Sequence, residues 1–321
     1  MLTRFSVSAN CRIIEKRIFM DFLITLLNGI SLGGVYAMIA LGYTMVYGIA
    51  KLLNFAHGDI IMVGGYTLYL FVFSSLPSFM PDTTWAILMP ILAILCAVIV
   101  CVILGVTVER VAYRPLRGAS PLAVLITAIG VSYLLQSLAL VLFGADTKIV
   151  VVLDLGVWRL GNLQIRVSTV ITLIATVVVM TALSLFVKYS KTGRAMVAVS
   201  EDRDAARLMG ININRIITIT FAIGSALAAL AGLFSLLDVP SLMPSFGALP
   251  GIKAFTAAVI GGIGSIPGAM LGGILLGVVE CICNSIPAIA PYTIAIEFAI
   301  LIIILLVRPT GILGKKRREK V

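Results

Sequence analysis

Long apolar stretches, separated by short polar segments, follow one another along almost the entire chain. A helix needs about 20 apolar residues to cross a hydrocarbon core of ~30 Å, because each residue adds ~1.5 Å. The stretches also lack the alternation of a membrane β-barrel. The pattern predicts an all-α, polytopic integral membrane protein with about eight membrane segments, and eight to ten if some are broken. The apolar stretches cover residues 22–49, 60–76, 85–108, 122–144, 168–187, 216–237, 252–283 and 291–307.

Composition supports a membrane protein and excludes several other classes. Hydrophobic residues make up 60% and charged residues 12% of the chain, whereas a soluble domain has roughly half and a quarter. A water-soluble enzyme, a disordered chain and a disulfide-rich secreted module are therefore excluded. The single histidine, His57, is too few for a multi-histidine metal site, and the five cysteines lack the spacing of a disulfide framework. We expect no metal site and reduced thiols.

The basic residues gather in a few polar segments. Lys and Arg number 24 against 14 Asp and Glu, and most of them lie in 4–17, 110–117, 188–215 and 308–320. Cytoplasmic loops of membrane proteins are enriched in Lys and Arg, so we expect these segments, and both termini, in the cytoplasm. The loop 145–167 is then outside. Because the orientation of the chain in the membrane accounts for the excess of positive charge, we expect membrane lipid and no nucleic acid as a partner.

The number of segments between the basic loops is irregular in the first half of the chain. Two apolar stretches separate 110–117 from 188–215, which fits two cytoplasmic loops, but three stretches separate 4–17 from 110–117. One piece within 22–76 is therefore predicted to be broken or re-entrant. The polar run Asn54–Asp59 is the expected break.

A second interruption, Gly261–Gly268, divides the 252–283 stretch. Irregular backbone at membrane depth persists only where protein covers it or it lines a cavity, and paired interruptions are typical of two internal repeats around a transport path. The glycines have an alternative role, since small residues at this spacing also allow helices to approach closely. The candidate path residues are Asn54, His57, Asp59, Gly261, Gly262, Gly264, Ser265 and Glu280.

The amino terminus and the longest basic loop complete the predicted organisation. Residues 1–19 are either a short cytoplasmic tail or an over-extended start before Met20, and 20–321 form one transmembrane domain. Within the loop 188–215, Ser200 is a good N-cap and Gly210 a good helix stop. These residues predict a short helix over 201–209, which is either an ordinary surface helix or a docking helix for a cytoplasmic partner.

Five charged residues lie in or beside the apolar stretches, where charge is costly and usually has a function. Glu109 is expected to be structural at the inner boundary. Lys253 either reaches the membrane surface or stays buried, and Asp59 either lines the path or holds the broken backbone. Glu280 and Glu297 are expected to face a pore or a neighbouring subunit, or to form a proton relay.

Several segments, in this order along nearly the whole chain, resemble the branched-chain amino acid ABC transporter permeases of the LivH type. The basic loop is similar to the cytoplasmic loop of ABC importer permeases. The matching segments are Asn28–Gly48, Asn54–Asp59, Glu109–Arg117, Gly193–Ala195, Glu201–Asp202, Lys253–Ala269 and Pro309–Gly314.

The resemblance implies a membrane subunit of an importer in the bacterial inner membrane, not an enzyme. It implies a second permease subunit, two cytoplasmic ATPases and a periplasmic substrate-binding protein as partners. The chain has no G-x-x-x-x-G-K-[ST] motif, so ATP and Mg²⁺ would be held by the ATPases and no cofactor by this chain. The expected contact with the ATPases is formed by Glu201, Asp202, Ala205, Ala206 and Gly210.

The implied activity is ATP-driven transport of leucine, isoleucine and valine by alternating access. Two alternatives share the architecture: an ion-coupled secondary transporter, which would need neither ATP nor partner chains, and an ABC permease for urea or short amides. An integral-membrane enzyme fits least, because it would need a nucleophile, an acid–base pair or a metal cluster at the membrane face.

Overall fold

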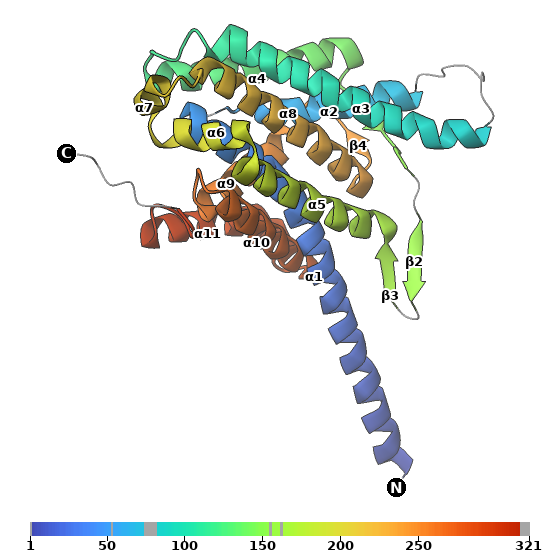
Figure 1. Cartoon of the computed structure of the whole chain (residues 1–321). Coiled ribbons are helices and arrows are strands. Elements are labelled where there is room, and N and C mark those ends of the chain that lie inside the picture. The colour runs from blue at the N-terminus through green and yellow to red at the C-terminus, as the bar shows by residue number, and fades with distance from the viewer. Residues whose placement is uncertain (1, 53, 74–81, 154–155, 161–162, 315–321) are drawn as a thin grey trace.

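The computed structural model describes residues 2–52, 54–73, 82–153, 156–160 and 163–314, which form a bundle of helices (Figure 1). The short strands β1 and β4 pair in antiparallel fashion, as do β2 and β3. The elements are α1 (Leu2–Ala50), α2 (His57–Phe73), α3 (Asp82–Val108), η1 (Glu109–Tyr113), α4 (Pro121–Phe143), β1 (Lys148–Ile149), β2 (Val157–Leu160), β3 (Leu163–Arg166), α5 (Val167–Tyr189), α6 (Lys191–Glu201), α7 (Arg203–Leu208), α8 (Ile213–Asp238), β4 (Ser241–Leu242), α9 (Ala248–Gly261), α10 (Ile266–Ser285), η2 (Ala290–Tyr292) and α11 (Thr293–Val307).

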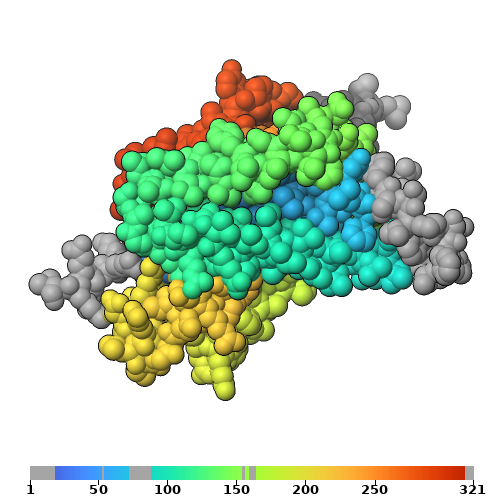
Figure 2. Space-filling model, turned by 90° about the horizontal axis from the view of Figure 1, so that it is seen from above, coloured from blue at the N-terminus to red at the C-terminus, as the bar shows by residue number. Residues whose placement is uncertain are grey.

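Seven helices of the described chain are long and apolar enough to cross a membrane. They are α1 from Phe19 onward, α3 with η1, α4, α5, α8, α10, and α11 with η2. Two shorter helices, α2 with 17 residues and α9 with 14, lie in the same bundle. The predicted all-α, polytopic membrane fold is confirmed. Figure 2 shows α3 and α4 side by side on one face. α4 exposes apolar side chains such as Leu134 and Val141, which suit contact with lipid or another helix.

The bundle has two ends, named here by the elements that lie there. The inner end carries α6, α7 and the turn between α9 and α10, and the outer end carries β2, β3 and the start of α5 (Figure 1). α1 runs from the outer to the inner end. Ser31 of α1 donates a hydrogen bond to the Thr169 carbonyl at the start of α5 (3.2 Å), and near the last residue of α1 the Ile49 carbonyl accepts one from Arg203 (2.8 Å).

The carboxyl-terminal segment lies at the inner end, because the Ile312 amide donates to the Ile260 carbonyl (2.9 Å) beside the α9–α10 turn. The membrane part of α1 therefore begins at the end opposite to residues 308–314 and 188–215. This differs from the expectation that both termini lie on the side of the basic loops. Three helices, α1, α2 and α3, lie between Phe19 at the outer end and η1 at the inner end. A chain that starts at one end and finishes at the other passes through an odd number of segments, so the count of three fits this fold.

The first four and the last four bundle helices are arranged alike but run in opposite directions. α1 packs against α9 and α10 as α8 packs against α2 and α3, and α2 packs against α3 as α9 packs against α10. The contacts are close where small residues meet: Gly33 of α1 lies against Gly277 of α10, and Gly105 of α3 against Ser225 of α8. This arrangement agrees with the two predicted repeats, with α5–α7 between them.

Each repeat contains one helix that begins inside the bundle. α1 is continuous to Ala50, so the glycine-rich stretch 22–49 is not itself broken; the chain turns back after it, and α2 begins at His57 between α1 and α8. α9 begins beside the same point, where a Cβ on Gly247 would lie 1.7 Å from the Gly58 carbonyl oxygen. The predicted interruption at 261–268 is the turn between two separate antiparallel helices.

Candidate functional site

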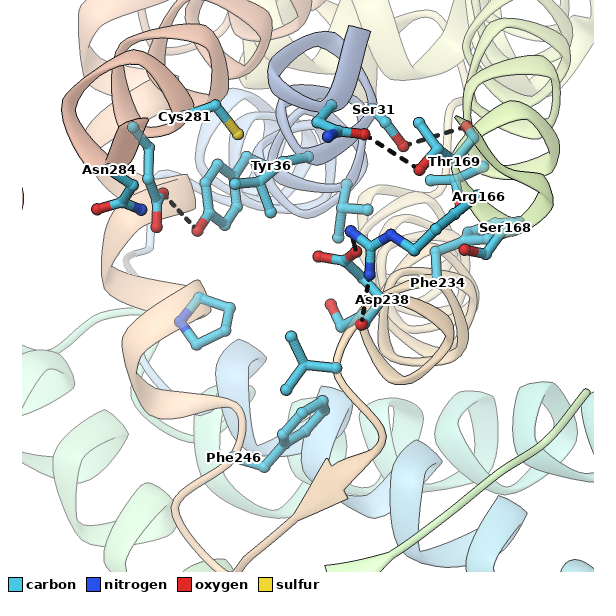
Figure 3. A pocket seen from close by; sticks show the side chains of 18 residues that line it. Ser31, Tyr36, Arg166, Ser168, Thr169, Phe234, Asp238, Phe246, Cys281 and Asn284 are labelled. Carbon is cyan, nitrogen blue, oxygen red and sulfur yellow. Dashed lines mark hydrogen bonds and ion pairs between the residues drawn. The ribbon is translucent and has the colours of Figure 1, made fainter. Parts of the chain in front are cut away.

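A cavity of about 420 Å³ lies at the outer end between α1, α5, α8 and α10 (Figure 3). We call it the outer cavity. Its lining includes Phe246, which precedes α9, Pro250 in the first turn of α9, and Val35 of α1. Ligand sites commonly occupy roughly 300–1,000 Å³, so the outer cavity has the size of a site for a small solute.

The wall formed by α1 and α5 is polar. The Thr169 hydroxyl donates to the Asn28 side-chain oxygen (3.3 Å), and the Thr169 carbonyl accepts from Ser31. At the mouth, Arg166 forms an ion pair with Asp238 (2.5 Å), and the two side chains remain 47% and 40% exposed. Arg166 is also the last residue of β3 and directly precedes α5, so the β2–β3 hairpin adjoins the rim of the cavity.

Behind the opposite wall, α9, α10 and α11 bring one ammonium and two carboxylates together. Lys253 Nζ lies 2.6 Å from Glu280 Oε1 and 3.3 Å from Glu297 Oε1, and the Tyr36 hydroxyl donates to Glu280 Oε2 (2.7 Å). Glu280 lines the outer cavity. Glu297 is buried, and its Oε2 has no hydrogen-bond partner among the described residues. Lys253 thus stays buried in this charged cluster instead of reaching the membrane surface.

The polar run at the start of α2 forms a second buried cluster, away from the outer cavity. Asn54 accepts a hydrogen bond from the Tyr113 hydroxyl (2.8 Å), and Asp59 accepts one from the Gln136 amide (2.8 Å). The His57 ring is buried against Gly42 and Gly224, where α1 and α8 cross. Of the three candidate path residues in this run, Asn54 lines a small cavity of about 10 Å³ toward the inner end.

The candidate path residues around 261–268 build the turn from α9 to α10. Gly262 and Gly264 have φ of +106° and +95°, a backbone conformation that glycine adopts without strain. Gly261 packs directly on Gly268, and the Ser265 hydroxyl caps α10 by accepting from the Gly268 amide (3.2 Å). Gly264 also lines a cavity of about 60 Å³ at the inner end.

The loop 188–215 contains two helices, α6 and α7, and α7 starts later than the sequence predicts. The Asp202 side chain accepts from the Asp204 and Ala205 amides (both 3.0 Å) and caps α7, whereas the Ser200 hydroxyl donates to the Val197 carbonyl inside α6. Glu201 is therefore the last residue of α6. Gly210, at φ +78°, follows the end of α7 as predicted.

The tip of α7 projects from the inner end. Leu208 and Met209 are 89% and 82% exposed, and Ala205 is exposed beside them, while Ala206 is buried. Among the expected contact residues of α7, Ala205 is therefore exposed and Ala206 packs inward. Sequence reasoning missed three residues of the outer cavity, Tyr36, Arg166 and Asp238. A sequence signal exists only for Tyr36, whose spacing from Gly29 and Gly33 places all three on the same side of a helix.

Helices that begin inside a membrane bundle, an inverted repeat and a polar cavity at one end together define a membrane transport protein. In the described part of the chain, no three His, Cys, Asp or Glu residues lie close enough to hold a metal ion. The family described as "Branched-chain amino acid transport system / permease component" matches residues 25–305. This chain belongs to that family.

Two bacterial relatives match over nearly their whole length. The chain is 42% identical over 308 residues to the "High-affinity branched-chain amino acid transport system permease protein LivH" of Salmonella typhimurium, covering 94% of this chain and 99% of the relative. It is 43% identical over 305 residues to the corresponding BraD protein of Pseudomonas aeruginosa, covering 94% and 98%. A probable LivH of Methanocaldococcus jannaschii is 27% identical over 307 residues, covering 89% and 91%. No solved structure matches the chain.

Proposed function

We propose that this chain is a permease subunit of an ATP-driven importer for leucine, isoleucine and valine in the bacterial inner membrane. Its partners would be a second permease, two ATPases that bind ATP and Mg²⁺, and a periplasmic protein that delivers the amino acid. The family and the names of the LivH and BraD relatives support the substrate class. The basic segments 188–215 and 308–320 support a cytoplasmic inner end, which would place the start of α1 outside.

The observation that carries the proposal is the exposed tip of α7. Its two apolar side chains, Leu208 and Met209, project from a basic segment at the inner end and contact the bundle little. An apolar pair standing out of a charged surface suits a pocket on another protein better than lipid headgroups or water.

The hydrogen bonds of α7 support a mechanical role. Arg203 bonds to the Ile49 carbonyl at the end of α1, and the Ala206 carbonyl accepts from the Ile211 amide (3.1 Å) just before α8. α7 is therefore attached to the inner ends of α1 and α8, which are the first helices of the two repeats. A displacement of α7 by an ATPase would move both repeats together.

The test replaces Leu208 and Met209 by Glu and measures co-purification of the ATPases and leucine uptake by cells that carry the complete transporter. We expect both to be lost while the permease remains in the membrane. The matched control is Leu122→Glu, an exposed residue (63%) in the first turn of α4, where a negative charge suits the helix dipole. Unchanged ATPase binding in the double variant would contradict the proposal, and uptake that persists without ATP would favour ion coupling through the Lys253 cluster.

A further inference from the structure

The charged cluster behind the outer cavity has more carboxylate than ammonium. Lys253 pairs with both Glu280 and Glu297, and the described residues place no second cation on these carboxylates. Glu280 is held firmly, because Lys253 fixes one oxygen and Tyr36 the other. A carboxylate oxygen can accept more than one hydrogen bond, so Glu280 can still receive a donor from the cavity that it lines.

The other side of the cavity carries one cation, Arg166, in an ion pair with Asp238. Figure 3 shows Arg166, Ser168 and Thr169 on the wall across from Tyr36 and Asn284. Arg166 contributes a guanidinium that is about half exposed and is shared with Asp238, which also lines the cavity. A guanidinium has five N–H donors, and the bonds to the carboxylate and the carbonyl of Asp238 use only some of them. The remaining guanidinium donors of Arg166 can bind an anionic group that enters the cavity.

Apolar side chains line the space between these two walls. Leu32 and Val35 come from α1, Phe234 from α8, and Phe246 from the segment before α9. A small molecule with an ammonium, a carboxylate and a branched aliphatic group would find a matching surface for each of its three parts.

We propose that the outer cavity is a transient binding site for the transported amino acid, with its α-ammonium on Glu280, its α-carboxylate toward Arg166 and its side chain against Leu32, Val35, Phe234 and Phe246. The proposal rests on the function proposed above and adds a substrate site within the permease itself. Glu280 is then a specificity-determining residue for α-amino acids.

The key variant, Glu280→Gln, is expected to fold. Lys253 keeps Glu297 as its carboxylate partner, and a glutamine oxygen can still accept from Tyr36. The matched control is Glu109→Gln, the same change at a buried glutamate of the other repeat, at the inner end and outside the outer cavity.

Cys281 lines the outer cavity and supplies the readout. The complete transporter, with its partner subunits and Cys281 as its only permease cysteine, is placed in nanodiscs without ATP and labelled with a small neutral maleimide. The labelling rate is measured with L-leucine, with 4-methylpentanoate, which lacks the ammonium, and with 3-methylbutylamine, which lacks the carboxylate. We expect leucine to protect Cys281 best, the amine less and the carboxylate least.

In Glu280→Gln, we expect half-protection to need at least about tenfold more leucine, while Glu109→Gln behaves as the parent. Leucine uptake by the same preparation in proteoliposomes separates the two proposals. Uptake without protection of Cys281, or equal protection in Glu280→Gln and the parent, would overturn the substrate site and leave the transport function standing. Protection without ATP-driven uptake would support the site and overturn the proposed function.

Discussion

Glu109 and Glu280 occupy comparable places in the two repeats, yet their surroundings differ. Each follows a close helix crossing by about one turn. Gly105 of α3 precedes Glu109, the first residue of η1, and Gly277 precedes Glu280 on α10. Each accepts a hydrogen bond from a hydroxyl on the first helix of the opposite repeat, Thr218 for Glu109 (2.9 Å) and Tyr36 for Glu280 (2.7 Å). Each also pairs with a cation.

The two carboxylates differ in what covers them. Glu109 is fully buried at the inner end, beneath Arg117, which also bonds to Asn214 of α8. Glu280 reaches a cavity of about 420 Å³ at the outer end. The same kind of contact is therefore sealed at the inner end and open to a cavity at the outer end.

Removing the cation of the outer cluster should have the largest effect. Lys253→Met leaves the buried carboxylate of Glu297 and the partly buried carboxylate of Glu280 without their ammonium, and breaking a buried ion pair in this way costs about 3–5 kcal/mol. The free energy of unfolding is measured by SDS titration in mixed micelles. Adding Glu280→Gln should recover part of the loss, because one of the two carboxylates is then gone. A double variant no more stable than Lys253→Met would show that the cluster does not act as an electrostatic unit.

The starts of α2 and α9 meet inside the bundle, and this contact should not tolerate an added atom. In Gly247→Ala the new Cβ would lie 1.7 Å from the Gly58 carbonyl oxygen, and such overpacking costs roughly 1–3 kcal/mol. We expect lower thermal stability of the detergent-purified protein and slower uptake. Gly130→Ala is the control, since no atom lies within 4 Å of its Cβ position on α4 and a helical Ala is favoured over Gly by roughly 0.5–1 kcal/mol. Equal behaviour of the two variants would argue against a tight crossing.

The difference between the sealed and the open glutamate predicts a smaller but informative contrast. Thr218→Val removes a hydrogen bond from fully buried Glu109 and should cost about 1.5 kcal/mol, whereas Tyr36→Phe should cost about 0.5 kcal/mol, because water in the cavity can replace the hydroxyl on Glu280. SDS titration of both variants measures the contrast. A larger loss for Tyr36→Phe would mean that the outer carboxylate is the sealed one.

Local sequence signals predicted some features well and ranked others wrongly. Gly210 follows the end of α7, as the sequence predicts, because glycine adopts the left-handed conformation at no steric cost. The start of the same helix was misplaced, since Ser200 and Asp202 are both good caps. Packing decides between them: α6 extends through Glu201, and the Ser200 hydroxyl is used inside it.

The count of segments was observed correctly, but the fold differs from the expectation that both ends of the membrane domain lie on the side of the basic loops. Three apolar stretches do lie between residue 19 and the inner loop 110–117, and none of them needs to be discarded. The basic residues of 4–17 suggested that α1 starts at the inner end, but its hydrogen bonds with α5 place its start at the outer end. Because charge counts describe segments one at a time, they carry no information on which helices run antiparallel.

The sequence by itself determined the all-α membrane class, the apolar segments and the basic segment that carries the proposed coupling helix. The reason is that apolar length and clustered charge are local properties, which the bilayer selects directly. Only the tertiary structure decided that α2 and α9 begin face to face inside the bundle, and that Lys253 meets Glu280 and Glu297 beside a cavity. These groups lie 27 and 44 residues apart in the sequence. Which of their faces meet depends on the packing of whole helices, and that packing is set by many small contacts that no local pattern records.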